Sequence, residues 1–442
     1  MNRIYLSLLT ILFSTHTQAQ PITPGKTDTV YSKTLGEPRR IHIHLPSGYG
    51  DTWFYPRRYP VLYLLDGDTH FSSVSSMIRL LSEGRGPLDF PELIIVAIPN
   101  TDRVRDLTPT RAARDPRMDS GSLSRTGGGE KFLSFISNEL MPHIDSIYRT
   151  APYKIFMGHS LGGLTVVNAF LHHTSMFNAY IATDPSMSWD DRKLLRQAKD
   201  ILQENKFAGR SLFLAIANNT PPGLDTITIR SDTSNLFSRH MTSIFSLRNI
   251  LAAAYPQPPY PFMPFSGQPP VPEKIPPAGQ APFRFSWKYY PDCDHGSLPL
   301  PAEYDALRFT FNYYSLFFPF PEFFQPSWTQ DTLLATHYKV ISRYMGYEVL
   351  PPETLVNNVG YNLMGSRQFD RAAYYFQLNI ENYPNSYNVY DSMGDLMAAQ
   401  QQKDSAIKWY QKALTLREEP GTREKMEKLR GELHRAEPVI DK

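Results

Sequence analysis

Two uninterrupted runs of apolar and aromatic residues constrain the fold of this chain more than any other feature. They cover residues 59–65 and 93–98. Continuous runs of this length are typical of strands that helices cover on both faces, and such strands belong to parallel sheets. Apolar residues recur at helical spacing in 71–82 and 129–148, so the pattern predicts a parallel sheet whose strands alternate with helices.

The same alternation extends over most of the chain. Two strand-like segments, at 30–35 and 40–45, predict edge strands ahead of the first buried one. Further strands are predicted at 154–157, 179–182, 211–217 and 283–290, and further helices at 161–172 and 234–254. The fold class expected from this order is a doubly wound, mostly parallel α/β sheet.

Charge and cysteine content exclude several classes of function. The 442 residues contain 45 Lys and Arg against 43 Asp and Glu, so no basic surface for nucleic acid or anionic lipid is indicated. Cys293 is the single cysteine, which permits neither an intramolecular disulfide nor a zinc site built on cysteine. The stability of the fold must therefore come from packing.

Residues 1–19 have the pattern of a removable signal peptide. Arg3 supplies a positive charge, residues 4–13 are mostly apolar, and residues 17–19 match a cleavage tripeptide. The apolar run is too short to span a bilayer. We therefore expect an exported protein, periplasmic or secreted, without a membrane span.

The pentapeptide 158–162 reads Gly-His-Ser-Leu-Gly and fits the pattern G-x-S-x-G. A predicted strand precedes it and a predicted helix follows it, which is the setting of a nucleophile elbow. Glycines at 158 and 162 allow a strained turn and a close approach of strand and helix. The sequence therefore predicts Ser160 as a catalytic nucleophile.

A serine hydroxyl needs a base within hydrogen-bond reach. His295 follows the last predicted strand, and in enzymes with this elbow the histidine comes last along the chain. Other histidines, at 159, 172, 173 and 240, have ordinary structural interpretations. We expect His295 to be the general base.

The acid that would orient this histidine is left open among three alternatives. An acid is expected just after the strand 211–217, where the first candidate is Asp225. Asp232 follows, although it also resembles a helix N-cap. The third alternative is a Ser-His dyad without an acid. Asp225 is the preferred candidate.

Two backbone amides are expected to hold the oxyanion that forms during acyl transfer. One belongs to Leu161, the residue after the nucleophile. The other comes from the turn that follows the strand 59–65, where Gly67 permits close approach and Asp68 carries the second amide. The sequence therefore predicts an oxyanion hole at Leu161, Gly67 and Asp68.

Five segments together resemble a known family. They are Tyr59 to Asp68, Met157 to Gly163, Asp184-Pro185-Ser186, Asp294 to Ser297, and Tyr304 to Arg308. This pattern resembles the "putative esterase" family of α/β-hydrolases, which includes esterase D, enterochelin esterases and feruloyl esterases. The resemblance spans about 30–318 and is greatest to an exported bacterial branch with C-terminal tetratricopeptide repeats. It implies an α/β-hydrolase fold and ester cleavage without metal or cofactor.

The chain divides into an esterase domain and a smaller helical domain. The expected boundaries are 20–325 for the α/β-hydrolase domain, with a proline-rich insertion at 256–282, and 326–436 for the helical domain. Three residue pairs in the helical domain are 34 residues apart, the period of tetratricopeptide repeats: Gly360 and Gly394, Ala372 and Ala406, Phe376 and Tyr410. Repeats are therefore predicted at about 353–386 and 387–420.

The preferred function is an exported serine carboxylic-ester hydrolase that acts through an acyl-enzyme. Its ester substrate is expected to be a sugar, aryl or siderophore ester, and the repeats are expected to bind a protein partner. One alternative is acyl transfer from the same Ser-His site to an acceptor other than water. Another is a non-catalytic scaffold that retains the hydrolase fold and binds a partner through its repeats.

Overall fold

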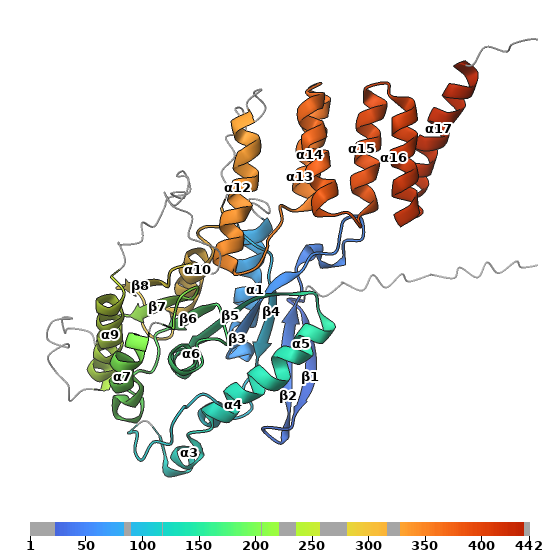
Figure 1. Cartoon of the computed structure of the whole chain (residues 1–442). Coiled ribbons are helices and arrows are strands. Elements are labelled where there is room, and N and C mark those ends of the chain that lie inside the picture. Colours follow the sequence, from blue (N-terminus) through green and yellow to red (C-terminus); the bar gives the residue numbers. More distant parts are fainter. Residues whose placement is uncertain are drawn as a thin grey trace, which may run out of the picture.

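The computed structural model describes residues 23–83, 90–116, 118–204, 206–220, 236–256, 281–315 and 328–436. The predicted signal peptide, residues 1–19, and nearly all of the predicted proline-rich insertion lie outside these residues. The described chain forms a mixed sheet flanked by helices, and a row of further helices extends away from it (Figure 1).

Eight strands form one sheet in the order β1-β2-β4-β3-β5-β6-β7-β8. They are β1 Lys26–Ser32, β2 Glu37–His44, β3 Tyr59–Leu65, β4 Ile94–Ile98, β5 Thr150–His159, β6 Ala179–Thr183, β7 Ser211–Ala217 and β8 Arg284–Tyr290. The pairs β1–β2 and β2–β4 are antiparallel, and every other pair is parallel. The carboxyl ends of β3 to β8 therefore meet at one edge of the sheet.

Helices cover both faces of the sheet, as the continuous apolar runs predicted. One core packs α4 Gly129–Phe135, α5 Met141–Ile147, α6 Leu161–His172, α7 Trp189–Ile201 and α9 Leu236–Ala254 against one face. The other core packs α1 Gly67–Glu83 and α10 Pro299–Thr310 against the opposite face. All seven residues of β3 are buried, and each buried leucine there stabilises the fold by roughly 1.5–3 kcal/mol.

The strand predicted at 154–157 is longer in the structure, as β5 Thr150–His159, and two further elements differ from the sequence prediction. The first edge strand ends at Ser32 rather than residue 35, because a turn follows in which the Gly36 N–H donates to the Ser32 carbonyl and Gly36 has φ 71°. The single helix predicted at 129–148 consists of α4, a π-helical turn at Ile136–Leu140 and α5. Short helices α2 Arg103–Asp106 and α3 Ser120–Arg125 precede it, and 3-10 turns lie at Ser47–Gly50 and Leu202–Glu204.

Within residues 328–436, six helices make up the C-terminal region that projects from the sheet in Figure 1: α12 Trp328–Met345, α13 Glu353–Gly365, α14 Phe369–Asn382, α15 Tyr387–Ala399, α16 Lys403–Leu416 and α17 Pro420–Ala436. The helix pair α13 and α14 begins and ends 34 residues before the pair α15 and α16. Each pair has the same close contact, in which Gly360 faces the Phe376 ring and Gly394 faces the Tyr410 ring. The region is therefore built from one repeated helical hairpin.

The helical region shares a core with the eight-stranded sheet. Tyr313, which follows α10, stacks on Tyr344 of α12 with ring centroids 4.6 Å apart. The buried Glu353 carboxylate, at the start of α13, accepts the Tyr55 N–H at 2.8 Å. Among the described residues, no helix combines the length and the apolar character needed to cross a membrane.

Candidate active site

Ser160 lies in a sharp turn between β5 and α6. Its backbone has φ 60° and ψ −116°, a region that a residue with a side chain adopts only where its surroundings enforce it. The Ser160 N–H donates to the Thr183 carbonyl at 3.0 Å, and the Ser160 carbonyl accepts the Ser186 N–H at 3.0 Å. A Cβ on Gly158 would lie 2.5 Å from the Gly162 carbonyl carbon, so this turn requires glycine.

The carboxylate of Asp184, at the end of β6, binds His295. The Asp184 Oδ2 atom lies 2.6 Å from His295 Nδ1, and Asp184 is fully buried. An ionised carboxylate only accepts hydrogen bonds, so Nδ1 of His295 carries a proton. In the neutral ring, Nε2 of His295 then has a free lone pair, which is the state that a general base needs.

A second histidine, His240 of α9, contacts the same carboxylate oxygen. Its Nε2 lies 3.0 Å from Asp184 Oδ2, and the Asn219 side-chain amide donates to this oxygen at 3.0 Å. The other oxygen, Oδ1, accepts the Ala217 N–H at 3.0 Å. Burial raises the pKa of the Asp184 carboxyl, but the hydrogen bonds from His240 and His295 outweigh burial, so this pKa lies well below its ordinary value. Asp184 is therefore ionised at neutral pH.

Hydrogen bonds from the end of β7 fix the loop that carries His295. The Asn218 N–H donates to the Cys293 carbonyl at 2.8 Å, and the Asn218 side-chain amide donates to the Pro291 carbonyl at 2.8 Å. Within the loop, Asp294 Oδ1 accepts the N–H groups of residues 296 and 297. The histidine is therefore held from both sides at the carboxyl edge of the sheet.

The turn from β3 into α1 lies beside the elbow. Asp66 has φ 51°, in the left-handed region, and a Cβ on Gly162 would lie 3.1 Å from its Oδ2 atom. A Cβ on Gly67 would lie 2.8 Å from the Ile98 nitrogen, so the turn approaches β4 too closely for a side chain. The first turn of α1, which contains Asp68, therefore begins next to the first turn of α6.

These two helix starts supply the backbone amides that the sequence predicted for an oxyanion hole. Leu161 is the first residue of α6, and Gly67 and Asp68 are the first two residues of α1. The first amides of a helix have no acceptor within the helix and carry its partial positive charge. Amides of this kind are suited to bind a developing negative charge, which is the role that the sequence predicted for them.

Arg103 joins the two turns. Its guanidinium donates to both carboxylate oxygens of Asp66, at 2.6 and 2.9 Å, and to the His159 carbonyl at 3.4 Å. Asn100 donates to the same Asp66 carboxylate at 2.8 Å. Burial raises the pKa of the Asp66 carboxyl, and Arg103 and Asn100 more than offset this, so the net pKa is lowered. The positive charge of Arg103 is thereby balanced by the ionised carboxylate of Asp66.

Four histidine rings follow one another across this edge of the sheet. The ring centroids of His70 and His159 are 6.0 Å apart, those of His159 and His295 are 4.4 Å apart, and those of His295 and His240 are 5.4 Å apart. Burial and the neighbouring His295 lower the pKa of His159 to about 4. His159 is therefore neutral at pH 7 and packs against the base without adding charge.

The structure places five of the predicted site residues along one edge of the sheet, namely Ser160, Leu161, His295, Gly67 and Asp68, but it does not join all of them. The Ser160 hydroxyl contacts the Ser186 hydroxyl at 3.4 Å, and among the described hydrogen bonds it has none to His295. Catalytic hydrogen bonds are often long without substrate and tighten when it binds. Asp225 and Asp232, the two acids considered from the sequence, lie outside the described residues.

Sequence reasoning about the acid missed Asp184, and it also missed His240 and Arg103. Asp184 directly follows a buried apolar strand, and this position was the available signal, because the carboxyl ends of parallel strands carry site residues. Nothing in the sequence pattern distinguishes His240 from an ordinary core histidine. Arg103 is the first residue of the short helix α2, and its partner Asp66 is known only from the fold.

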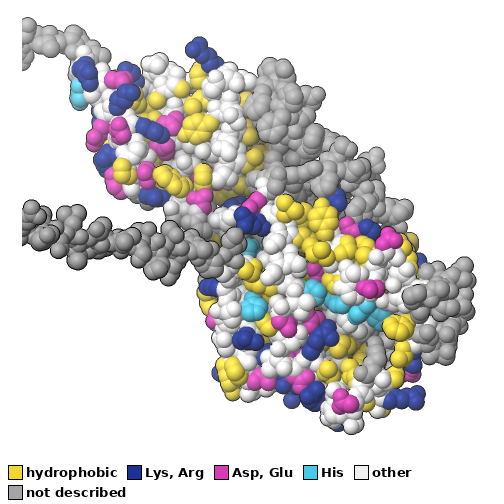
Figure 2. Space-filling view, turned by 180° about the vertical axis from the view of Figure 1, so that it is seen from behind, with side chains coloured by type: hydrophobic (Ala, Val, Ile, Leu, Met, Phe, Trp, Pro, Cys, Tyr) yellow, Lys and Arg dark blue, Asp and Glu magenta, His cyan; other side chains and the backbone are white. Residues whose placement is uncertain are grey.

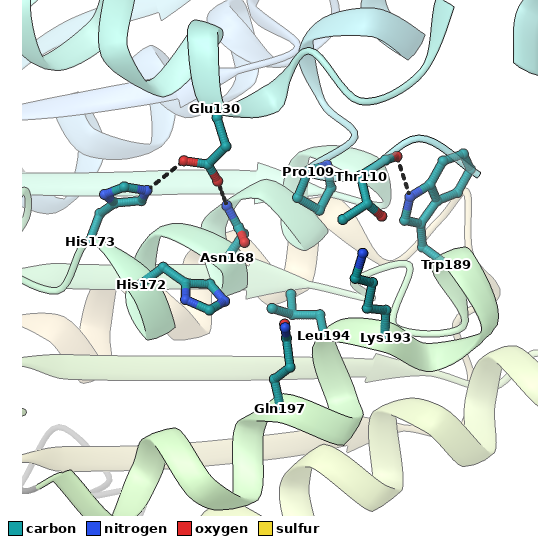
Figure 3. Close-up of a pocket in the computed structure, with 10 residues that line it drawn as sticks. All are labelled: Pro109, Thr110, Glu130, Asn168, His172, His173, Trp189, Lys193, Leu194 and Gln197. Atoms are coloured by element: carbon teal, nitrogen blue, oxygen red, sulfur yellow. Dashed lines mark hydrogen bonds and ion pairs between the residues drawn. The ribbon is translucent and has the colours of Figure 1, made fainter. Parts of the chain in front are cut away.

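A separate pocket of about 450 Å³ lies on the flank of the domain, among α4, α6 and α7 (Figure 3). Glu130 on its wall accepts from the Asn168 side chain at 2.9 Å and contacts His173 Nε2 at 2.8 Å. The side chains of His172 and Lys193 point into it. His172 and His173 lie at the end of α6 opposite Ser160, so this pocket does not include the candidate catalytic residues.

Comparison with known proteins adds an independent observation. A family model described as "Putative esterase" matches residues 32–221. The ferri-bacillibactin esterase BesA of Bacillus subtilis is 31% identical over 206 residues, which cover 44% of this chain and 70% of BesA. The siderophore enterobactin esterase of Emericella nidulans is 27% identical over 220 residues, covering 45% of this chain and 70% of that protein.

A solved structure also matches over a long stretch. The IroE-like serine hydrolase from Shewanella oneidensis superposes with a TM-score of 0.63 at 27% identity. The match covers 81% of this chain and 99% of that chain. The fold, the serine elbow and the matched sequences therefore point to the same class of enzyme.

Proposed function

Because this chain belongs to the esterase family of α/β-hydrolases, whose members are serine hydrolases, we propose that it cleaves carboxylic esters with Ser160, His295 and Asp184 as its catalytic triad. The observation that carries the proposal is the Asp184–His295 contact of 2.6 Å beside a strained serine turn. A carboxylate on Nδ1 fixes the tautomer in which Nε2 accepts a proton. This replaces the sequence preference for Asp225 as the acid.

In the proposed first step, Ser160 Oγ attacks the ester carbonyl and His295 Nε2 accepts the serine proton. The resulting imidazolium is stabilised by the buried Asp184 carboxylate. Histidine then gives its proton to the leaving alcohol, and an acyl-Ser160 intermediate remains. Water attacks this intermediate with the same base and releases the acid. The serine hydroxyl rotates from Ser186 toward His295 when substrate binds.

The oxyanion of each tetrahedral intermediate is proposed to bind between the starts of α6 and α1. Leu161 N–H provides one donor, and the Gly67–Asp68 turn provides the other. Arg103 holds these donors at a fixed separation because it bonds both Asp66, next to Gly67, and the carbonyl of His159, next to Ser160. Loss of a single oxyanion donor costs about 100- to 1,000-fold in kcat in enzymes of this type.

The substrate proposed is a siderophore ester. Support comes from the matched relatives, whose names specify ferri-bacillibactin and enterobactin esterases, and from the chain covering 70% of each. Of the sugar, aryl and siderophore esters considered from the sequence, the siderophore ester is therefore the class proposed. We expect the iron-loaded and iron-free forms of such an ester to be hydrolysed at different rates, since iron changes the shape presented to the site.

A substrate panel tests this proposal. The purified chain is incubated with bacillibactin, enterobactin, a feruloyl sugar ester and p-nitrophenyl acetate, and products are separated by liquid chromatography. We expect kcat/KM for a siderophore to exceed that for the other esters, and no turnover by Ser160→Ala. A higher kcat/KM for the feruloyl ester would contradict the proposed substrate class. Products in which the acyl group is joined to an added sugar or alcohol acceptor would indicate acyl transfer instead of hydrolysis.

We propose that the repeated helical hairpins are tetratricopeptide repeats. The 34-residue offset of both helices and the repeated glycine–aromatic contacts support this. In such a repeat, a small residue on the first helix lets an aromatic ring of the second approach closely. A partner protein is therefore proposed for this region, and a pull-down with the full chain against a chain ending at residue 325 tests it.

Export to the periplasm or the medium is proposed from the pattern of residues 1–19. Amino-terminal sequencing of the protein produced in a bacterial host tests it directly. We expect the mature chain to begin at Gln20. A chain recovered with Met1 or Asn2 at its start would contradict export by this route.

A further inference from the structure

We propose that Asp184, His240 and His295 form a binding site for a divalent transition-metal ion such as Zn²⁺, and that the bound ion switches the esterase off. The inhibitory part rests on the proposed function, because it requires His295 to be the base. The binding part stands on geometry alone.

Three atoms of the right chemical kind converge at this point. Asp184 Oδ2, one His240 ring nitrogen and one His295 ring nitrogen all lie within 4.8 Å of one another. Two imidazoles and a carboxylate form a ligand set that zinc uses in proteins, with an open fourth position for water. Bonds of about 2.0 Å at tetrahedral angles separate ligand atoms by roughly 3.3 Å. Small side-chain rotations would therefore bring all three atoms into position.

His240 is the residue that makes this site unusual. A Ser-His-Asp triad needs one histidine, yet His240 reaches from α9 to the oxygen that His295 already binds. The ring is 8% exposed, and its other nitrogen, Nδ1, is buried with no hydrogen-bond partner among the described residues. The contact places a second imidazole nitrogen next to a carboxylate oxygen, which adds a third ligand atom of the kind that zinc binds.

An ion can reach the site from solvent. The His295 side chain is 41% exposed, whereas Asp184 is fully buried behind it. Histidine side chains form a band across the surface of the esterase domain in the view of Figure 2, with acidic side chains among them. The Ala217 N–H holds Oδ1 of Asp184, and Oδ2 faces both rings and the Asn219 side-chain amide, which a bound ion would displace from this oxygen. The site is therefore open on the histidine side and rigid on the carboxylate side.

Metal binding would remove the base by inverting the tautomer of His295. In the resting site the proton of His295 is on Nδ1 and the lone pair is on Nε2. A metal bound to Nδ1 takes the lone pair of that atom, so the proton of the neutral ring must move to Nε2. Nε2–H cannot accept the proton of Ser160. His240 changes in the same way, since its proton moves from Nε2 to Nδ1, and no proton is gained or lost overall.

The first experiment reads binding without reference to activity. Co²⁺ is added to the purified full chain, and visible absorption is recorded, because tetrahedral Co²⁺ absorbs strongly and octahedral aqueous Co²⁺ weakly. His240→Gln retains a side-chain amide that can donate to Asp184 but removes the imidazole ligand. His240→Phe is a second variant that keeps the ring volume. His173→Gln is the control, since His173 contacts the Glu130 carboxylate at 2.8 Å without a third ligand.

The second experiment measures ester hydrolysis against free Zn²⁺, with each variant compared with its own metal-free rate. We expect reversible inhibition of the wild type and of His173→Gln, restored by a chelator. In both His240 variants we expect loss of the Co²⁺ band and at least a 100-fold rise in the Zn²⁺ concentration for half inhibition, since even outer-shell changes cost about 10- to 100-fold in metal affinity.

The two experiments separate failure of the site from failure of the proposed function. A Co²⁺ band that depends on His240, in a chain without esterase activity, would support the metal site and contradict the esterase mechanism. Active enzyme with no Co²⁺ band would overturn the metal site alone. A band or an inhibition constant that is the same in the wild type and both His240 variants would also overturn it.

Discussion

Replacing Asp184 by asparagine isolates the part of the mechanism that the sequence did not resolve. The substitution preserves size but puts an amide where three donors converge on one oxygen: the ring nitrogens of His240 and His295, and the Asn219 amide. The asparagine NH₂ group can occupy only one of the two oxygen positions. Both orientations are unfavourable, for different reasons.

If the NH₂ group faces the histidines, His295 must present a lone pair at Nδ1 and carry its proton on Nε2. The base is then in the wrong tautomer, a change that costs about 10,000-fold in kcat in serine hydrolases. If the NH₂ group faces the Ala217 N–H instead, two donors meet in a buried site, at a cost of about 1–3 kcal/mol in folding free energy. We therefore expect Asp184→Asn to lose about 1,000- to 10,000-fold in kcat with a smaller change in KM.

The assay is steady-state hydrolysis of p-nitrophenyl acetate, with Asp225→Asn measured in parallel. Asp184→Asn activity within about 10-fold of the wild type would refute the assignment of the acid, given the size of the tautomer effect. A large loss of kcat in Asp225→Asn but not in Asp184→Asn would support Asp225 as the acid, as the sequence predicted.

The same carboxyl makes stability depend on pH. Its folded-state pKa is lowered below the unfolded value of about 3.9, so its stabilising contribution is present above that value and is lost as pH falls through the folded pKa. Urea unfolding of the wild type and Asp184→Asn between pH 3 and pH 7 measures this. The stability difference between the two chains should shrink toward the acid end, and a difference that grows there would contradict the reasoning.

Three further predictions concern other parts of the fold. Arg103→Met should lower kcat by about 100-fold with little change in KM, which is close to the loss caused by removing one oxyanion donor. An equal loss of a binding property that does not depend on the active site would instead indicate that the variant is unfolded. Because the pKa of His159 is lowered to about 4, the wild type should lose up to roughly 3 kcal/mol of unfolding free energy between pH 6.5 and pH 4, and His159→Gln should lose less in urea titrations. Gly360→Ala should destabilise the helical region by about 1–3 kcal/mol, because the added Cβ would lie 2.5 Å from the Phe376 ring. Gly365→Ala is the control: its Cβ would point into open space on the same helix, so this variant should not lower the melting temperature of the helical region.

Local patterns were sufficient to predict most of the sheet. The run 59–65 is β3 to the residue, because a strand buried on both faces leaves no ambiguity about its extent. The helix after Ser160 and the strand at 211–217 were also placed correctly, because both are mostly apolar and are buried over nearly their whole length. The first edge strand was less well bounded, since one face of it meets solvent and the turn at Gly36 carries little apolar signal.

The candidate site was harder to predict because its key contacts join residues far apart in the sequence. Ser160 was found from a motif whose strain and spacing are local. Asp184 was not chosen, because the expected position of the acid was one strand later, after β7. The structure shows why both strands matter: β6 carries the carboxylate, and the end of β7 supplies the Ala217 and Asn219 groups that hold it. Only the paired sheet brings these groups together.

Ser160 is proposed as the nucleophile that this site activates. A fluorescent phosphonate probe for serine hydrolases tests it: the purified chain is labelled, digested, and the modified peptide identified by mass spectrometry. We expect labelling of the peptide that contains Ser160, none in Ser160→Ala, and strongly slowed labelling in Asp184→Asn. Absence of labelling in the folded wild-type chain, or labelling at another serine that persists in Ser160→Ala, would contradict it.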